Sequence, residues 1–255
     1  MDRELTFAGT NLGTFDAHFS NGGSFPVPAR IYEHVDVLGR NGTLLIDSGK
    51  YGNVKITFPA YVYEEFRGSY NDLIEFLSSK VGYQRIEDSL EPDVYRMGAY
   101  VGGTNPSVKN SDEMGSFEIT FDCKPQKFLK QNESGITVGS SSSDAVSFSN
   151  PTAFVSKPLI KMYSNSRLII NGSSFFTMQM GNLSQAGSGV NYAYVDCDTL
   201  QVYSEGGENL TGYLTINSYA YGNEKFPFFG SGGSWTAYNT VASSRDIIYP
   251  RWWKI

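Results

Sequence analysis

Residues 34–47 read HVDVLGRNGTLLID and predict a β-hairpin. An Asn41-Gly42 pair stands inside this stretch, and Asn-Gly is the pair that most strongly favours a tight turn between two strands. Branched apolar residues occupy alternate positions on both sides of the pair, as Val35, Val37, Leu44 and Ile46. Alternation with a period of two is typical of a strand that buries one face. The stretch therefore predicts two antiparallel strands joined by a turn.

The same period recurs in the rest of the first half. Residues 53–59 (NVKITFP) and 115–125 (GSFEITFDCKP) alternate apolar and polar side chains, which predicts two half-buried strands. The chain has 27 glycines, 17 tyrosines and 17 phenylalanines, and only 18% of its residues are charged. A composition rich in turn-forming and aromatic residues favours antiparallel sheets over helices. We therefore expect a mainly β protein.

One helix is expected, over residues 69–82 (SYNDLIEFLSSKVG). Ser69 and Asp72 have the spacing of a capping box, and Gly82 stands where a left-handed residue would end the helix, just after Lys80. One stripe of this helix carries its apolar residues: Leu73, Ile74, Phe76 and Leu77. We expect the stripe to cover one face of the sheet in the first half.

A stretch rich in serine and glycine divides the chain of 255 residues. We expect a connection at residues 134–149, between an N-terminal domain at 1–133 and a C-terminal domain at 150–255. Short strands separated by Gly, Ser and Asn turns are predicted throughout the second domain: 158–163, 167–180, 192–198, 200–204, 213–222, 234–239 and 246–253. This density of strands is typical of a β-sandwich.

The charge and hydropathy of the chain argue against several kinds of partner. The formal net charge is −6 and the Lys and Arg residues do not cluster, whereas nucleic-acid binding depends on cations that neutralise phosphates. We therefore expect no sequence-specific nucleic acid. No apolar run is long enough to cross a bilayer, and the first residues do not form an apolar signal region. We expect no membrane partner and a cytoplasm-like compartment.

Histidine and cysteine patterns predict no metal or cofactor. His18 and His34 are the only histidines, so a Ser-His-Asp or Cys-His site would need long-range convergence that no motif indicates. Cys123 and Cys197 lack the spacing of metal ligands. Both cysteines fall in strand-like alternation, which favours buried free thiols.

Asp196 and Asp198 are the best candidate for an enzyme site. On an extended strand they would lie on one face, roughly 6.5–7 Å apart. Inverting glycosidases use carboxyl groups about 6.5–9.5 Å apart. However, two carboxyl groups that are two residues apart on one strand point in the same direction and do not flank the bond to be cleaved. Strands also commonly carry paired acids on a solvated face. We therefore expect a protein that is not an enzyme.

Tryptophans offer a second alternative, a sugar-binding module. An exposed indole can stack on a pyranose ring, and the second half contains Trp235, Trp252 and Trp253. This half has no histidine and no His-x-Asn-x-Arg run of the kind that galectins use. The same indoles also fit a sandwich core or a subunit interface.

Motifs of both halves occur together in one order. The first half contains the hairpin stretch with Tyr51 and Asn53, then EFLSS (75–79), YQRIEDSLEPDVYRMGAY (83–100) and FEITFDCKP (117–125). The second half contains NPTAFVSKPLIKMY (150–163), LIINGSS (168–174), VDCDTLQVY (195–203), FPFFGSG (226–232) and YPRWW (249–253). In their joint order and spacing these motifs resemble the siphophage distal tail (Dit) proteins over nearly the whole chain.

The resemblance implies a fold and a function. The fold is an N-terminal β-sandwich with one helix, followed by a galectin-like C-terminal β-sandwich. The function is that of a structural virion protein, a homohexameric ring at the end of the tail tube with a channel for DNA. Implied partners are the tail tube protein, the tail-associated lysin or spike protein, and baseplate or receptor-binding proteins. The implied location is the virion tail tip, after assembly in the bacterial host cytoplasm.

The same pattern leaves an alternative function. A lectin-like adhesion module that contacts host cell-wall saccharide would share the galectin-like domain. The second domain has no long insertion of the kind that forms an arm in some distal tail proteins, so direct gripping of receptor-binding proteins by an arm is not expected.

Two regions are candidates for contacts with other proteins. The last predicted strand, 246–253 (DIIYPRWW), should place one of its two indoles in the core and the other outside, where it would contact a neighbour. In the first domain we expect ring contacts from residues 39–42 and 51–53; a solvated turn with Arg40 as a solvated charge is the alternative for residues 39–42. The candidate contact residues are Arg40, Asn41, Gly42, Tyr51, Asn53, Trp252 and Trp253.

Overall fold

The structure, a computed structural model, describes residues 3–23, 26–102, 106–109, 113–187, 189–218, 226–241 and 245–255. The chain divides into two compact units, one running to Phe128 and including Ile255, the other formed by Leu129–Lys254. The boundary falls within β10 (Met114–Leu129). Both units consist mainly of strands, which confirms the predicted mainly β, two-domain class.

The first unit contains one main sheet with the strand order β2-β1-β7-β8-β10-β6-β3, and β9 also pairs with β10. An isolated bridge pairs Arg3, which precedes β1, with Phe19 of β3, the last strand of this order. The first unit thus has one main sheet that closes on itself, where the sequence predicted a sandwich of two packed sheets. Besides β10 its strands are β1 (Leu5–Phe7), β2 (Thr10–Asn11), β3 (His18–Phe19), β6 (Val54–Val62), β7 (Gln84–Asp88), β8 (Val94–Tyr100) and β9 (Ser107–Lys109).

Arg3 holds this closure from the inside. Its buried guanidinium donates to both carboxylate oxygens of Asp88, at 3.0 and 2.5 Å, and to the backbone carbonyls of Ser20 and Gly22, at 3.0 and 2.8 Å. The same group lies 4.8 Å from the ring centroid of Phe58. A buried cation is tolerated only when it is paired and its donors are satisfied, and here one arginine ties three segments together.

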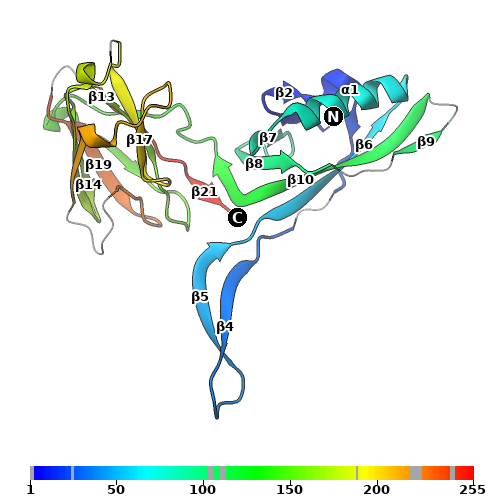
Figure 1. Ribbon diagram of the computed structural model, residues 1–255, viewed down its shortest axis with the longest axis horizontal. Helices are drawn as coiled ribbons and strands as arrows, with labels where there is room; N and C mark the ends of the chain where they lie inside the picture. Colours follow the sequence, from blue (N-terminus) through cyan, green and yellow to red (C-terminus); the bar gives the residue numbers. More distant parts are fainter. Residues whose placement is uncertain are drawn as a thin grey trace. The chain divides into compact units, whose positions relative to one another are not determined.

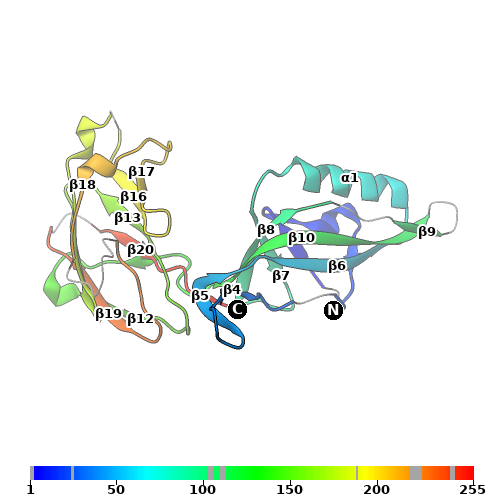
Figure 2. The same cartoon turned by 60° about the horizontal axis from the view of Figure 1, so that its bottom comes forward.

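Alternation in β6 and β10 builds the core of the first unit. Their alternate apolar side chains are buried, as the sequence predicted: Val54, Ile56, Phe58, Phe117, Ile119, Phe121 and Cys123. Helix α1 (Phe66–Ser79) lies across one face of this sheet (Figure 2) and buries Phe66, Leu73 and Leu77. Gly115 of β10 permits the close approach, because a Cβ there would lie 2.5 Å from the ring of Phe66.

The predicted start of the helix is wrong by about one turn. The helix begins at Phe66, and Glu65 precedes it with a left-handed φ of 49° and no side-chain cap. Ser69 lies inside the helix and donates to Asp16 at 3.4 Å, so the capping box is not formed. Burial of Phe66 against β10 and Phe117 explains the earlier start, since tertiary packing can override local capping preference. Gly82 is left-handed, as expected, but the helix has already ended at Ser79.

β4 (Arg30–Asp36) and β5 (Thr43–Tyr51) form a two-stranded sheet of their own, hereafter the β4–β5 ribbon. The predicted hairpin is thus confirmed. Asp36 pairs with Thr43, so residues 37–42 form the loop and Asn41-Gly42 is not a two-residue turn. Figure 1 shows the ribbon projecting from the main sheet of its unit.

The second unit consists of two five-stranded sheets, which confirms a β-sandwich (Figure 2). One sheet has the order β11-β20-β13-β16-β17: β11 (Ile136–Thr137), β13 (Leu159–Tyr163), β16 (Tyr192–Asp196), β17 (Gln201–Tyr203) and β20 (Ile247–Tyr249). The other has the order β12-β19-β14-β15-β18: β12 (Val146–Ser149), β14 (Arg167–Gly172), β15 (Phe175–Met180), β18 (Leu214–Ser218) and β19 (Ser234–Asn239). The strand predicted at 213–222 extends beyond the described residues after Ser218.

Aromatic side chains occupy the space between these two sheets. Phe229 lies 5.0 Å from Trp235 and 5.6 Å from Trp252, measured between ring centroids, and all three are buried. Phe148 packs edge-on against Phe229 at 5.0 Å. This cluster gives the second unit a core of its own.

Residues 134–149 are not the connection that their composition predicted. They contribute β11, a 3-10 turn at Ser142–Asp144 and β12 to the second unit. Val138 is buried in the core, and Phe148 packs against it, while the serines of β12 point outward. The serines therefore form the solvated face of an edge strand. Their alternation with Val146 and Phe148 indicates this strand, whereas the serine-rich composition suggested a connection.

Asp246 is a buried carboxyl group in the second unit. Its Oδ1 accepts from the backbone N–H of Tyr163 and its Oδ2 accepts from the side-chain amide of Asn239, both at 2.8 Å. No cation is paired with it among the described residues. Burial raises the pKa of Asp246 to about 6, against the opposing effect of these hydrogen bonds.

This raised pKa predicts a pH-dependent stability. The folded protein retains a proton on Asp246 that the unfolded chain, with an ordinary pKa of 3.8, has already lost. The contribution of Asp246 to the free energy of unfolding should therefore fall by about 2–3 kcal/mol as pH rises from about 4 to about 6, and stay level above. Urea unfolding of the wild type and of Asp246→Asn across this pH range measures this contribution. The free energy of unfolding of the wild type should fall with pH relative to that of the variant.

Asp198→Asn is the matched control, because it removes an exposed carboxylate from the same unit. Asp246→Asn is expected to be less stable than the wild type at low pH, since its new amide would face the amide of Asn239. The test is therefore the change of the free energy of unfolding with pH and not its absolute value. Parallel pH profiles of wild type and Asp246→Asn would contradict the assignment.

Candidate functional site

The described residues contain no group of three or more His, Cys, Asp or Glu side chains arranged to hold a metal. Among the same residues, no helix has the length and hydropathy that a membrane crossing requires. Cys123 and Cys197 are buried free thiols. Burial raises the pKa of Cys123 to about 12 and that of Cys197 further still, so neither is a thiolate nucleophile near neutral pH.

Asp196 and Asp198 do not form a pair of catalytic carboxylates. Arg251 binds both oxygens of Asp196, at 2.9 and 3.2 Å, and the backbone N–H groups of Asp198 and Thr199 donate to the same carboxylate. Burial opposes the charge, but these hydrogen bonds outweigh it and hold the pKa of Asp196 below its ordinary value. Asp198 is exposed, 3.7 Å from Lys157. Asp196 is thus a structural anchor for Arg251.

The terminal tryptophans lie in different environments, as predicted, although not in one continuous strand. Arg251 has a left-handed φ of 54° and separates β20 from β21 (Trp253–Lys254). Trp252 is fully buried, so it cannot be the contact residue that the sequence proposed. Trp253 stacks on Phe154 at 4.2 Å and donates to the carbonyl of Val155 at 2.9 Å. Contact of its partly exposed ring with another protein stays a prediction.

The structure also limits the sugar-stacking alternative. Trp235 and Trp252 are both buried in the core of the second unit, so neither indole offers a face to a ligand. One face of Trp253 is covered by Phe154. Trp235 and Trp252 therefore serve the first of the expected roles, a sandwich core.

The predicted contact residues of the first unit lie in the β4–β5 ribbon, except for Asn53. Arg40, Asn41 and Gly42 lie exposed in the loop of the β4–β5 ribbon. Tyr51, at its base, accepts from Arg30 at 3.3 Å. Asn53 lies outside the ribbon, where it donates to the hydroxyl of Tyr83 at 2.5 Å and to Asp122 at 3.2 Å. A role of any of these residues in subunit contacts stays a prediction.

The β4–β5 ribbon has two unlike faces. Directly paired residues share a face, so the pairs Val35↔Leu44 and Glu33↔Ile46 define one face that is mainly aliphatic. The opposite face carries His34, Asp36, Thr43, Leu45 and Asp47 and is mainly polar. Arg30 and Asp47 form an ion pair at the base of this polar face, which raises the pKa of Arg30 and lowers that of Asp47.

Large apolar side chains of the ribbon are exposed on both faces. Five of them are 40–52% exposed: Ile31, Tyr32, Leu44, Leu45 and Ile46. Leu38, in the loop, is fully exposed. The sequence indicated the hairpin but not this surface, because alternation predicts a buried face without saying which chain covers it. The unusual signal was the run Leu44-Leu45-Ile46, which is apolar at every position and so puts apolar side chains on both faces.

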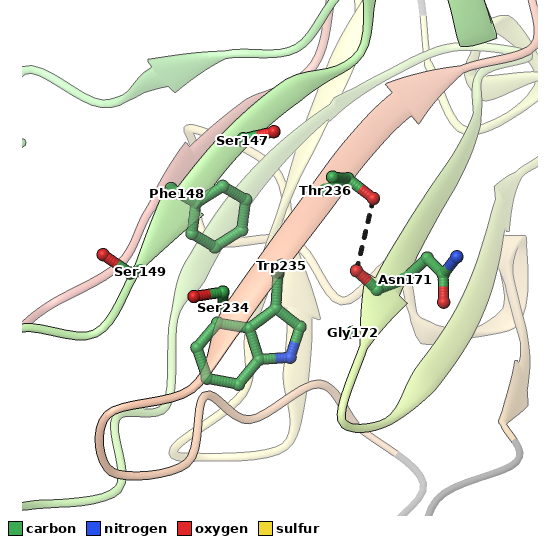
Figure 3. A pocket seen from close by; sticks show the side chains of 8 residues that line it. All are labelled: Ser147, Phe148, Ser149, Asn171, Gly172, Ser234, Trp235 and Thr236. Carbon is green, nitrogen blue, oxygen red and sulfur yellow. Dashed lines mark hydrogen bonds between the residues drawn. The ribbon is translucent and has the colours of Figure 1, made fainter.

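A shallow depression of about 460 Å³ lies on the second unit. It is lined by residues 147–149 of β12, 171–172 of β14 and 234–236 of β19, hereafter the hydroxyl-lined depression. Figure 3 shows Ser147, Ser149, Ser234 and Thr236 around it, with the rings of Phe148 and Trp235 beside them. No sequence motif indicated this depression, because its residues come from three separated stretches of the chain.

Residues 17–123 match the family model of the phage tail protein RIFT-related domain. The match covers most of the first unit, including the ribbon, α1 and most of the main sheet. Over these residues the first unit is similar to a phage tail protein RIFT-related domain. A tail domain of this kind is structural, in agreement with the expectation that the chain is not an enzyme.

Two solved structures share the fold of nearly the whole chain. The Dit protein of phage SPP1, described as a paradigm of the hub adsorption apparatus in phages that infect Gram-positive bacteria, is 14% identical with a TM-score of 0.62, over 96% of this chain and 97% of that chain. A chain of the phage P2 baseplate in its activated conformation with Ca is 11% identical with a TM-score of 0.50, over 96% and 98%. No curated protein matches the sequence.

The resemblance to siphophage distal tail proteins is therefore confirmed. The tail domain carries it in the first unit, and the shared two-unit β fold carries it over the rest of the chain. At these identities the two structures show the fold.

The terminal residues give a test of the second unit. Replacing Trp252 by Ala should lower the free energy of unfolding by about 3–5 kcal/mol, because it leaves a large cavity in the core. Replacing Trp253 by Ala should cost only about 1 kcal/mol, the value of a partly exposed aromatic pair. Chemical denaturation followed by circular dichroism compares the two variants. Equal losses, or a larger loss for Trp253→Ala, would contradict the described burial.

Proposed function

We propose that the chain is a hub protein of the siphophage tail tip, which joins the tail tube to the baseplate. The tail domain of the first unit and the fold shared with a hub protein and a baseplate chain support this role. In this proposal the protein is a virion component of the tail tip, assembled in the bacterial host cytoplasm.

The β4–β5 ribbon carries the proposal. A two-stranded hairpin is marginally stable in water unless another surface packs on it, and this ribbon has no third strand or helix against it among the described residues. Its backbone edges are open, which makes it a template for further pairing. Exposed aliphatic side chains on both faces add an apolar surface that a soluble monomer would not normally leave uncovered.

Copies of the same chain are the proposed cover for this surface. A ribbon that packs on the next subunit makes a head-to-tail contact, and such contacts generate a closed ring when the rotation between subunits closes. Six copies are proposed from the resemblance to distal tail proteins. The mainly aliphatic face, with Val35, Leu44 and Ile46, is the face assigned to the neighbouring subunit.

The ring would enclose a channel through which DNA passes. A formal net charge of −6 repels phosphates, so DNA would not adhere to such a ring. The proposed partners are the tail tube protein on one side, and the tail-associated lysin or spike protein with baseplate or receptor-binding proteins on the other.

Assembly of the purified protein tests the proposal. Light scattering over a range of concentrations, with negative-stain images of any large species, should show sixfold rings with a central hole. The double variant Leu44→Ser/Ile46→Ser should weaken assembly at least about tenfold, because it removes two aliphatic side chains from the contact, a loss of about 1.4 kcal/mol or more.

Val81→Ser/Leu90→Ser is the matched control, since it removes two exposed aliphatic side chains from the same unit outside the ribbon. This control should assemble like the wild type. Assembly of the ribbon variant at wild-type concentrations would refute the role of the aliphatic face. A wild-type chain that stays monomeric both alone and with the tail tube protein would refute the ring.

A further inference from the structure

Arg96 is a buried cation inside the closed sheet of the first unit. It lies on β8 and pairs directly with Ile86 of β7, so its side chain shares the inner face of the sheet with that buried isoleucine. The residue is only 8% exposed. Its guanidinium makes no hydrogen bond and no ion pair with any described residue, and its Nη1 is fully buried.

The charge of Arg96 needs a partner. Burial lowers the pKa of Arg96, and the attraction of Glu91 opposes this effect. A guanidinium nevertheless stays protonated at neutral pH, so it cannot avoid the cost of burial by losing its charge. A buried charge without a partner is strongly destabilising, whereas a paired one is tolerated.

The carboxylates nearest to Arg96 are already paired with other cations. Asp88 accepts from the guanidinium of Arg3 through both of its oxygens. Glu91 forms an ion pair with Lys127. The cations Arg3, Lys127 and Arg96 thus face only two carboxylates, and this end of the sheet interior carries one uncompensated positive charge.

A small cavity of about 20 Å³ lies beside Arg96. Asp88 and Glu91 also line it, and the apolar side chains of Ile56, Phe58 and Ile86 form much of the remaining wall. A single water needs about 10–15 Å³, so the cavity has room for one species of roughly that size. A halide ion fits this description, whereas a larger oxyanion such as sulfate does not. Of the two small species, only the halide would also neutralise Arg96.

We propose that this cavity binds one chloride-sized monovalent anion against the guanidinium of Arg96. The anion would accept hydrogen bonds from Arg96 and would balance the excess charge of the cluster. Because the cavity is lined by residues of β6, β7 and β8, a bound anion would stabilise the closed sheet next to the Arg3–Asp88 pair. The site lies outside the ribbon, so it is independent of ring formation.

Chlorine NMR with the full chain tests the site, because the resonance of free chloride broadens when the ion exchanges with a site on a slowly tumbling protein. The wild type should broaden the resonance saturably with chloride in the millimolar range. Bromide should compete, and sulfate at the same ionic strength should not. Arg96→Met should weaken chloride binding at least about tenfold. Methionine suits this test, because an apolar side chain of similar size is tolerated in place of a buried charge.

Arg67→Met is the matched control. Arg67 is exposed on α1, and no residue of that helix lines the cavity, so the same substitution removes the same charge elsewhere in the unit. This variant should broaden the chloride resonance like the wild type. Absence of saturable broadening by the wild type would overturn the proposal. So would undiminished broadening by a folded Arg96→Met variant.

Hydrogen–deuterium exchange of the wild type decides the matter if Arg96→Met does not fold. Replacing gluconate by chloride at constant ionic strength should slow exchange of the amides in β8, residues 94–100, because the bound ion suppresses local opening. Exchange in β12 of the second unit should not change. Equally fast exchange of β8 in the two salts would overturn the proposal.

Discussion

The β4–β5 ribbon is paired only with itself, and most of the proposed function depends on this constraint. A hairpin of two strands gains little stability from its own hydrogen bonds, and here its aliphatic side chains remain exposed on both faces. Packing of these side chains on another surface would remove them from water and would stabilise the ribbon at the same time. Burial of the same apolar surface would thus both order the ribbon and hold neighbouring subunits together.

The rest of the first unit is a stable base for such a ribbon. Its main sheet closes on itself, and buried Arg3 ties the closure to Asp88 and to two backbone carbonyls. Helix α1 covers the core from one side. The second unit has a separate aromatic core around Phe229, Trp235 and Trp252. Each unit therefore keeps its own fold, and the ribbon is the part whose order needs a partner.

Sequence patterns predicted what local periodicity determines. Alternation located the ribbon, β6 and β10, and the apolar stripe of α1 was correct at Leu73 and Leu77. The predictions failed where tertiary contacts determine the local structure. Phe66 extends the helix by packing on Gly115, and Phe148 draws a serine-rich stretch into the second sandwich. Candidate sites were harder to predict, because the depression combines side chains from β12, β14 and β19, and because the burial of Trp252 depends on the turn at Arg251.

Hydrogen–deuterium exchange of the backbone amides in residues 30–51 tests the central claim most directly. It should be measured on the dissociated chain and on the assembled hub, with residues 146–149 of β12 as an edge strand that should not change. Assembly should slow exchange in the ribbon at least about tenfold, because partner packing closes its edges and suppresses local opening. Exchange in the ribbon that is equally fast, or equally slow, before and after assembly would contradict this claim.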